Sequence, residues 1–290
     1  MKAFVVGGTG LLGRHLVPML IEEGHRVTVM SPGDRWGWLP DEVDRVRASL
    51  VAPGTPELLR TRLAGHDVVV NLASAVPADP TAPGAWQLNT QLRRDGTRVL
   101  LDAVRDIGVR RLVQMSISMV YADGGDRWLD ESAPFDPDPA RAGLVDPVVA
   151  MESAVTRHRP DELAWTVLRG GRFVGPGTLQ DAQVAALRAG RLPVAGDGRS
   201  FVSMVHVRDY AAAVSAAVRA GAAGLVCNVC ADPVRVADYL DTVARLVGAG
   251  RPRRDPAGRS ELPSQRVSSA RARCELGWRP RHGIWPTPAK

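Results

Sequence analysis

Lysine is almost missing from this sequence. It occurs only at the two ends, as Lys2 and Lys290, so no lysine side chain is available for chemistry in the interior of the chain. The three cysteines, Cys227, Cys230 and Cys274, are too few for a disulfide framework. Two of them form a CNVC pair within GLVCNVC, a run typical of a buried strand, where residues three apart face opposite sides. This geometry favours core cysteines over a metal or redox pair.

Long apolar runs and metal-ligand spacings are also missing. No run reaches the ~18 residues of a membrane span, and the N-terminal KAFVVGGTGLLG is broken by glycines with no A-x-A-like site after it. We therefore expect a cytoplasmic protein with no membrane partner and no metal. The net charge of +6 comes almost wholly from arginines, which crowd the end of the chain without interleaved aromatics. A solvated face is the expected reading, and a nucleic-acid partner is not expected.

Short apolar runs alternate with amphipathic segments through the first two thirds of the chain. The strand-like runs are KAFVV, RVTVM, DVVVNLA, RRLVQMS and AWTVLRG, and the helix-like segments between them include LLGRHLVPMLIEEG, QLRRDGTRVLLDAVRDIG and VVAMESAVTRHR. This alternation predicts an α/β fold, a doubly wound parallel sheet of Rossmann type. We expect a core from 1–170, joined by 201–229, and a smaller substrate lobe built from 171–200 and 230–290.

The stretch VVGGTGLLG, residues 5–13, joins the first strand to the first helix, which is the context that makes a glycine fingerprint meaningful. Gly7 or Gly8 permits the tight turn, Gly10 lets the backbone approach a pyrophosphate, and Gly13 allows close packing of helix on strand. Two spacings fit, one starting at Gly7 and one at Gly8. Leu11 and Leu12 complete the predicted dinucleotide-binding loop. The phosphates of the bound dinucleotide would face the N-terminus of the helix.

The residues after the second strand bear on the choice of dinucleotide. An acidic side chain there would bond the ribose 2′-hydroxyl of NAD. The sequence instead has a small Ser31 with Arg35 nearby, which suits a 2′-phosphate and favours NADP. Asp34 keeps NAD as the second choice, because a shifted loop would bring its carboxylate to the ribose.

Several segments together resemble the extended short-chain dehydrogenase/reductase family of NAD(P)-dependent epimerases and dehydratases. They are DVVVNLA, GTRVLLDAVRDIGVRRLVQMS leading into SMVYADGG, LRGGRFVGPG and FVSMVHVRDYA, and the resemblance runs from Lys2 to about Arg281. It implies that the glycine loop binds the dinucleotide and that the substrate lobe begins at 172–177. It also implies a small-molecule substrate and a possible homodimer. The further cofactor contacts that it implies are Leu12, Asn71, Leu72 and Ala73.

The family's chemistry uses a tyrosine and a lysine four residues later, on the helix after the fifth strand, and this chain has neither. Taking Glu152 as the glutamate beyond the lysine places Val148 and Leu144 at those two positions. A shift of register changes nothing, because there is no tyrosine between Tyr121 and Tyr210. A phenol with a pKa near 10 is a poor base until a nearby cation favours its ionised form. The usual proton-transfer pair is therefore absent.

The family's hydroxyl position falls on Ile117, flanked by Ser116 and Ser118, which would point to the opposite face of a strand. These serines remain candidate hydroxyl donors if the segment is bulged. Tyr121 is a candidate acid or a packing residue. Asp146 is a candidate base or simply the N-cap of a helix that begins at Pro147, later than the tyrosine position requires.

Four further residues are candidates for substrate contact. Arg172 would steady an anionic or carbonyl-rich substrate or pair with a backbone carbonyl. Trp128 and Phe173 would suit a flat apolar substrate, with core or rim packing as the alternative. His206 either contacts substrate or has a structural role.

We expect an atypical NADP(H)-dependent reductase acting on a carbonyl or hydroxyl substrate, such as a specialised metabolite or sugar, with a non-standard proton donor. The alternative is a redox-neutral cyclase, dehydratase or isomerase on the same fold. A non-catalytic dinucleotide sensor is a less favoured third hypothesis.

Overall fold

A computed structural model describes residues 1–77, 79, 82–258 and 263–286. The chain forms two compact units, each assembled from segments far apart in the sequence. Unit 1 contains Met1–Ser116, Asp138–Leu168 and Ala211–Val226, and unit 2 contains Ile117–Pro137, Arg169–Tyr210 and Cys227–Lys290. Residues 117–137 thus group with the second unit, although they lie inside the stretch predicted as the core.

A seven-stranded sheet with the order β12-β7-β5-β4-β1-β2-β3 carries the fold. Its strands are β1 (Lys2–Val6), β2 (Arg26–Ser31), β3 (Asp44–Arg47), β4 (Val68–Asn71), β5 (Arg111–Ile117), β7 (Ala164–Gly170) and β12 (Leu225–Val229). The strands from β1 to β5 pair in parallel, and Val6 lies between Met30 and Asn71. The carboxyl ends of β1, β2 and β4 therefore meet at one edge. The predicted doubly wound fold class is confirmed.

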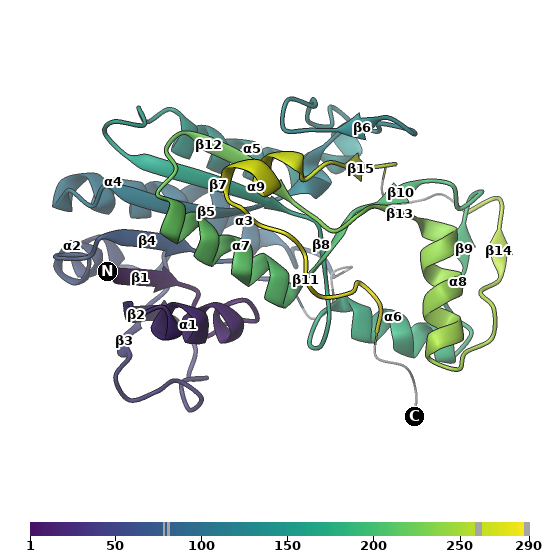
Figure 1. The fold of residues 1–290 in the computed structure, drawn as a ribbon, viewed down its shortest axis with the longest axis horizontal. Helices are drawn as coiled ribbons and strands as arrows, with labels where there is room; N and C mark the ends of the chain where they lie inside the picture. The colour runs from purple at the N-terminus through teal and green to yellow at the C-terminus, as the bar shows by residue number, and fades with distance from the viewer. Residues whose placement is uncertain (78, 80–81, 259–262, 287–290) are drawn as a thin grey trace. The chain divides into compact units, whose positions relative to one another are not determined.

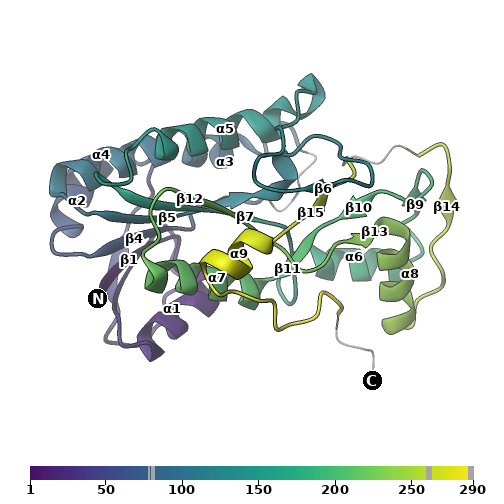
Figure 2. The same ribbon diagram turned by 45° about the horizontal axis from the view of Figure 1, so that its top comes forward.

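Helices cover both faces of this sheet (Figures 1 and 2). On one face lie α1 (Gly13–Glu22) and α7 (Val207–Ala220). On the other lie α2 (Thr55–Arg62), α5 (Ala142–Thr156), the 3₁₀ turn η3 (Pro139–Arg141), and a run made of α3 (Gln87–Gln91), the π-helix η1 (Leu92–Gly96) and α4 (Thr97–Ile107). Apart from the edge strand β3, the strands between them are almost wholly buried, which explains their near-continuous apolar sequences.

Unit 2 contains short strands in two-stranded pairs, together with several helices and turns. Its elements are η2 (Ser118–Val120), β6 (Trp128–Leu129), β8 (Arg172–Val174), α6 (Leu179–Arg188), β9 (Val194–Ala195), β10 (Phe201–Val202), β11 (Met204–His206), β13 (Val234–Arg235), α8 (Val236–Leu246), β14 (Arg254–Asp255), β15 (Arg266–Val267) and α9 (Ala270–Glu275). The pairs are β10 with β13, β11 with β8, β14 with β9 and β15 with β6. A separate cluster of buried apolar residues, several of them on α8, forms a hydrophobic core within this unit.

Two smaller expectations have different outcomes. Cys227 and Cys230 are buried free thiols at the end of β12, so the prediction of core cysteines is confirmed. The expectation that a helix begins at Pro147, capped by Asp146, is wrong. Helix α5 begins at Ala142, so Asp146 is an exposed residue within the helix and Pro147 is its sixth residue. Among the described residues, no helix is both long and apolar enough to cross a bilayer.

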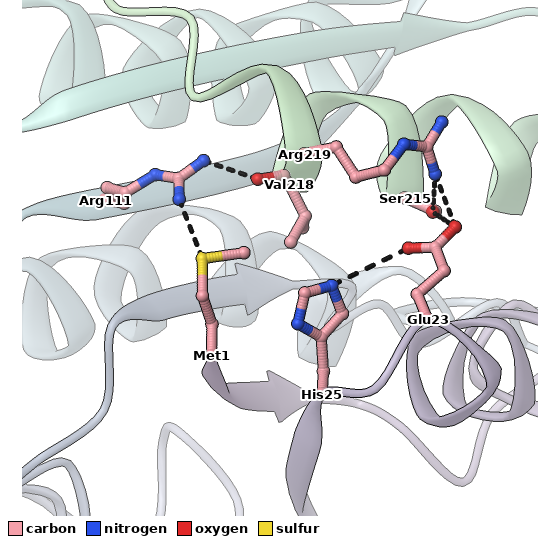
Figure 3. Close-up of polar contacts among 7 residues, drawn as sticks. All are labelled: Met1, Glu23, His25, Arg111, Ser215, Val218 and Arg219. Atoms are coloured by element: carbon pink, nitrogen blue, oxygen red, sulfur yellow. Dashed lines mark hydrogen bonds and ion pairs between the residues drawn. The ribbon is translucent and has the colours of Figure 1, made fainter.

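The amino ends of β1 and β2 are tied to α7 by a polar cluster in unit 1 (Figure 3). Glu23, just after α1, accepts hydrogen bonds from Ser215 (2.6 Å) and from the guanidinium of Arg219 on α7. His25 lies beside this carboxylate, with its Nε2 3.7 Å from Glu23 Oε2. The guanidinium of Arg111, on β5, donates to the carbonyl of Val218. These contacts anchor α7 against the sheet edge opposite the glycine loop.

The His25 ring makes the stability of unit 1 dependent on pH. Its side chain is only 8% exposed, and burial, followed by the charge of the N-terminal amine, lowers its pKa below the usual value of 6.5. The unfolded chain therefore takes up a proton at a higher pH than the folded chain does. The stability is fully present above pH 6.5 and is lost as the pH falls below it, by at most about 1.4 kcal/mol per pH unit for one histidine.

We expect His25→Gln to flatten the fall in unfolding free energy between about pH 6.5 and pH 5. The measurement is urea denaturation of both proteins across this range. Some slope should remain in the variant, because burial also lowers the pKa of His66 and His206. An identical slope in the two proteins would contradict the prediction.

Candidate functional site

The glycine loop forms a tight cradle at the carboxyl end of β1. Gly7 has a φ of +78°, and a Cβ on it would lie 3.0 Å from the backbone of Leu72. A Cβ on Gly13 would lie 1.9 Å from the carbonyl oxygen of Gly8, and one on Gly10 would lie 3.1 Å from that of Gly7. Both predicted spacings therefore contain glycines that the packing requires, but only the one starting at Gly7 includes the left-handed turn.

Helix α1 starts directly at this cradle. Its N-cap position is Leu12, which is buried and offers no side-chain cap, and its first turn contains no acidic residue. Leu11 is half-buried in the loop before it. The positive dipole end of the helix therefore lies at the cradle, where it favours an anion such as a pyrophosphate, although the amides of Arg14 and His15 already donate to the carbonyls of Gly10 and Leu12.

The end of β2 lies beside the glycine loop. The hydroxyl of Thr9 donates to Ser31 Oγ at 2.6 Å, and both side chains are buried. Ser31 is therefore placed next to the predicted phosphate loop. Asp34 and Arg35 follow in an exposed turn, so both the acidic and the basic candidate lie in the same short segment. The geometry is compatible with a bare ribose and with a 2′-phosphate.

The segment after β4 forms the other wall of the cradle. Asn71 donates to Gln114 on β5 at 2.9 Å, and its Oδ1 accepts from the amide of Ala73 at 3.1 Å. Leu72 is buried, and its backbone contacts the Gly7 turn. The structure thus brings Asn71, Leu72 and Ala73 together with the glycine loop, as the resemblance implied. The hydrogen bonds of the Asn71 side chain hold this segment in place beside the Gly7 turn.

The helix that was expected to hold the proton-transfer pair presents apolar side chains. On α5, Val148 is fully buried and Leu144 is half-buried. Glu152, one turn further on, is also buried and accepts a 2.5 Å hydrogen bond from the hydroxyl of Ser116 on β5. Ser116 therefore joins β5 to α5, and Asp146 lies exposed on the helix.

Tyr121 is the centre of a buried polar network in unit 2. Its hydroxyl donates to Asn228 Oδ1 at 2.7 Å and accepts from Arg169 at 2.8 Å. The amide of Asn228 donates to the carboxylate of Glu131, whose backbone carbonyl accepts from Arg169. Burial raises the pKa of Tyr121 far above its usual value of 10, despite the nearby guanidinium. Burial thus outweighs these contacts and keeps the phenol neutral.

Ser118 lies in the turn η2 and not in a strand, so the expected alternation of strand faces ends at Ile117. Its hydroxyl is buried 3.9 Å from the thiol of Cys230, whose pKa burial raises to about 12. Ser118, Ser116 and Tyr121 are thus all engaged inside their own units, and a catalytic role for each of them stays a prediction.

Three of the predicted substrate residues lie on one pair of strands in unit 2. Arg172 and Phe173 are on β8, which pairs with β11 and brings Val174 opposite His206. The Phe173 ring packs on Tyr210, and the His206 ring stacks on His282 at 4.8 Å. These two aromatic rings are therefore engaged by neighbours of the same unit.

Trp128, on β6, is 54% exposed, and the Arg266 guanidinium lies 4.2 Å from the centre of its ring. Core packing of this residue is therefore excluded, and rim packing or substrate contact remains. Across the described residues, no three His, Cys, Asp or Glu side chains gather in a group that would hold a metal ion.

Sequence reasoning missed two buried polar residues near the cradle. Asn89, on α3, accepts a hydrogen bond from the amide of Ala75 at 3.1 Å, and Arg93, one turn later on η1, is 9% exposed. The signal was present, since polar residues recur every four positions in NTQLRRDGT.

The chain is similar in sequence to a known protein family and to characterised reductases, and similar in fold to solved structures. Residues 3–230 match the model of the NAD dependent epimerase/dehydratase family. The 3-diazoavenalumate denitrifying reductase of a Streptomyces species is 34% identical over 305 residues, which cover 98% of each chain. The ceramide reductase of Caulobacter vibrioides is 31% identical over 77% of this chain and 62% of its own length. Among solved structures, the UDP-glucose 4-epimerase of Thermus thermophilus in complex with NAD has a TM-score of 0.76, with 25% identity over 98% of this chain and 95% of that chain.

Proposed function

The chain belongs to the NAD dependent epimerase/dehydratase family, and we propose that it is an NADP(H)-dependent reductase whose substrate takes up a hydride without needing a proton from the enzyme. One observation carries this proposal. The cradle for the dinucleotide is complete, whereas the chain between Lys2 and Lys290 contains no lysine, and Leu144 and Val148 stand at the expected tyrosine and lysine positions.

The residues of unit 1 fit a bound dinucleotide. Gly7, Gly10 and Gly13 leave space that any Cβ would fill, and α1 begins directly at this loop with its positive dipole end toward the place of the pyrophosphate. We assign Ser31 and Arg35 to the 2′-phosphate, which makes NADP the preferred cofactor and NAD the second choice. When bound, NADPH supplies a hydride, and the chain's own residues orient it and exclude water.

The missing pair favours a substrate other than a simple ketone. Reduction of a carbonyl consumes a hydride and a proton, and in the family the tyrosine supplies the proton. Replacement of the nitrogen of an aryl diazonium ion by hydride gives an arene and N₂, with no net proton. The Streptomyces relative acts by its name as a denitrifying reductase of a diazo compound. We therefore propose an aryl diazo compound as the substrate class.

Other chemistries remain as competing proposals. A carbonyl or hydroxyl substrate would need a non-standard donor, for which Ser116, Ser118, Tyr121 and Asp146 are the candidates. A redox-neutral cyclase, dehydratase or isomerase would retain the cradle and use no net hydride. A non-catalytic sensor would bind the nucleotide only.

The test begins with NADPH and NADH titrations of the purified protein, followed by fluorescence. We expect NADPH to bind at least about tenfold more tightly than NADH, as a phosphate-reading site should. The protein is then incubated with NADPH and either 3-diazoavenalumate or 4-carboxybenzenediazonium. We expect one N₂ released for each NADPH oxidised, and a slower reaction with NADPH deuterated at C4 of the nicotinamide.

Heat-denatured protein is the control, because diazonium ions also react with NADPH in free solution. NADPH oxidation with ketones but not with diazo compounds would replace the proposed substrate class. Binding without oxidation of NADPH would favour the redox-neutral alternative, and absence of NADPH binding would end the proposal.

A further inference from the structure

A polar cluster of unit 2 that the proposed function does not use holds the segment 278–286 against the first turn of α7. Asp209, on this turn, is 2% exposed. Its carboxylate accepts from the His282 ring at 2.6 Å and from the His282 amide at 2.8 Å. Its backbone carbonyl accepts from the indole of Trp278, also at 2.8 Å. The docking of the segment therefore depends on the position of this one residue.

The ring of His206 fixes the start of the same helix and must be unprotonated at Nδ1 to do so. His206 directly precedes α7, and its Nδ1 accepts from the amide of Arg208 at 3.2 Å, in the manner of an N-cap. A proton on Nδ1 would turn this acceptor into a donor that faces another donor. It would also place a positive charge at the positive end of the helix dipole.

The stacking of His206 on His282 gives a second reason against a proton on His206. The ring centres are 4.8 Å apart, and the ring planes differ by 18°. The Asp209 carboxylate can balance a positive charge on His282, but a charge on His206 as well would bring two cations face to face. The His206 ring has no room to turn away, because a Cβ on Gly175 would lie 2.6 Å from its Nε2.

The charged groups around His206 act in the same direction overall. Burial is the largest cause that lowers its pKa below the usual 6.5, followed by the charge of His282, and Arg208 lowers it further. Asp209 raises it, without reversing the shift. The residues that β8 places against the ring are uncharged, namely Val174 and Gly175. The contacts of the cluster are therefore fully present above pH 6.5 and are lost as the pH falls below it.

We propose that the His206–His282 pair makes the docking of the segment 278–286 sensitive to pH, and that the segment leaves unit 2 when both rings are charged. A proton on His206 removes the cap of α7 and so frees the turn that carries Asp209. The carboxylate then moves away from the donors of the segment. The hydrophobic core around α8 does not titrate in this pH range, so the rest of unit 2 stays folded.

The test is amide hydrogen exchange of the whole protein at about pH 7.5 and about pH 5.5, with correction for the intrinsic effect of pH on exchange. Peptides from 278–286 should lose at least about fivefold of their protection at the lower pH, because one histidine supplies up to about tenfold per pH unit. Peptides from α8 should change by less than about twofold, since the release is local.

His206→Asn removes the titrating ring and retains an acceptor that suits the start of a helix. In this variant, protection of 278–286 should differ by less than about twofold between the two pH values. His25→Gln replaces a buried histidine of unit 1 and is the matched control, which should show the full loss of wild type. His206→Gln serves the same purpose if the first variant does not fold. In wild type, the NMR titration of the His206 ring should follow the same pH course as the loss of protection.

Three outcomes would overturn the inference. They are an equal loss of protection in wild type and His206→Asn, unchanged protection of wild type at the lower pH, and a loss in α8 as large as that in 278–286. A loss confined to 278–286 and dependent on His206 supports it. Because no substrate or cofactor enters the measurement, this result does not depend on the proposed reductase function.

Discussion

Replacing Gly13 with alanine is expected to abolish NADPH binding and to lower the free energy of unfolding by at least about 3 kcal/mol. The new Cβ would lie 1.9 Å from the carbonyl oxygen of Gly8 and 2.3 Å from its carbonyl carbon. Both are backbone atoms, so no side-chain rotation relieves the clash. The start of α1 must move away from the loop, and the amide groups that would hold the pyrophosphate move with it.

Gly37→Ala is the matched control, since a Cβ at this exposed position meets no atom within 4 Å and the φ of Gly37 is not positive. Urea denaturation and fluorescence titration with NADPH should distinguish the two variants clearly. We expect the control to stay within about 0.5 kcal/mol of wild type. A Gly13→Ala protein that binds NADPH as wild type does would show that the loop does not form the cradle described above.

Much of unit 1 could be predicted from the sequence because its elements depend on local patterns. The buried parallel strands have continuous apolar runs, and the glycine loop has a spacing that few other structures need. Strand β3 was missed because only Val46 of its four residues is buried, as is common at a sheet edge. Helix α2, TPELLRTR, was missed because it buries only Thr55 and Leu59.

The start of α5 was predicted at the wrong Asp-Pro pair, although the preference of such pairs for helix starts was correct. The chain has three Asp-Pro pairs in this region, Asp136-Pro137, Asp138-Pro139 and Asp146-Pro147, and each could begin a helix. Only Asp138-Pro139 does so, since the Asp138 carboxylate accepts from the amide of Ala140 at 2.9 Å and caps the turn that leads into α5. The apolar packing of the following residues then carries the helix through Pro147.

The side-chain networks of the candidate site could not be predicted, because they join residues distant in the sequence. The Tyr121 hydroxyl donates to Asn228, 107 positions away, and the Tyr121 side chain is fully buried, which its place in the sequence did not indicate. Arg93 is likewise only 9% exposed, and its segment η1 packs against the distant helix α5. Residue type and spacing identified the cradle, whereas the state of each polar group required the tertiary structure.

Asp209→Asn is expected to release the C-terminal segment from unit 2. The Asp209 carboxylate is 2% exposed and accepts from the amides of Arg281 (3.0 Å) and His282 (2.8 Å) and from the His282 ring (2.6 Å). The ring of His282 in turn stacks on His206. An asparagine side chain retains one acceptor oxygen and turns an amino group toward the remaining donors. Because this leaves buried donors unpaired, we expect a loss of about 2 to 4 kcal/mol in the free energy of unfolding.

The control is Asp232→Asn, which removes the charge of an 86% exposed side chain that pairs with Arg273 at 2.8 Å. An exposed pair of this kind contributes little, so this variant should lie within about 0.5 kcal/mol of wild type. Limited proteolysis should cut Asp209→Asn within residues 278–286 sooner than either other protein. NADPH affinity should be unchanged, because the glycine loop belongs to unit 1. Resistance to proteolysis equal to that of wild type would mean that the segment is held by contacts other than this carboxylate.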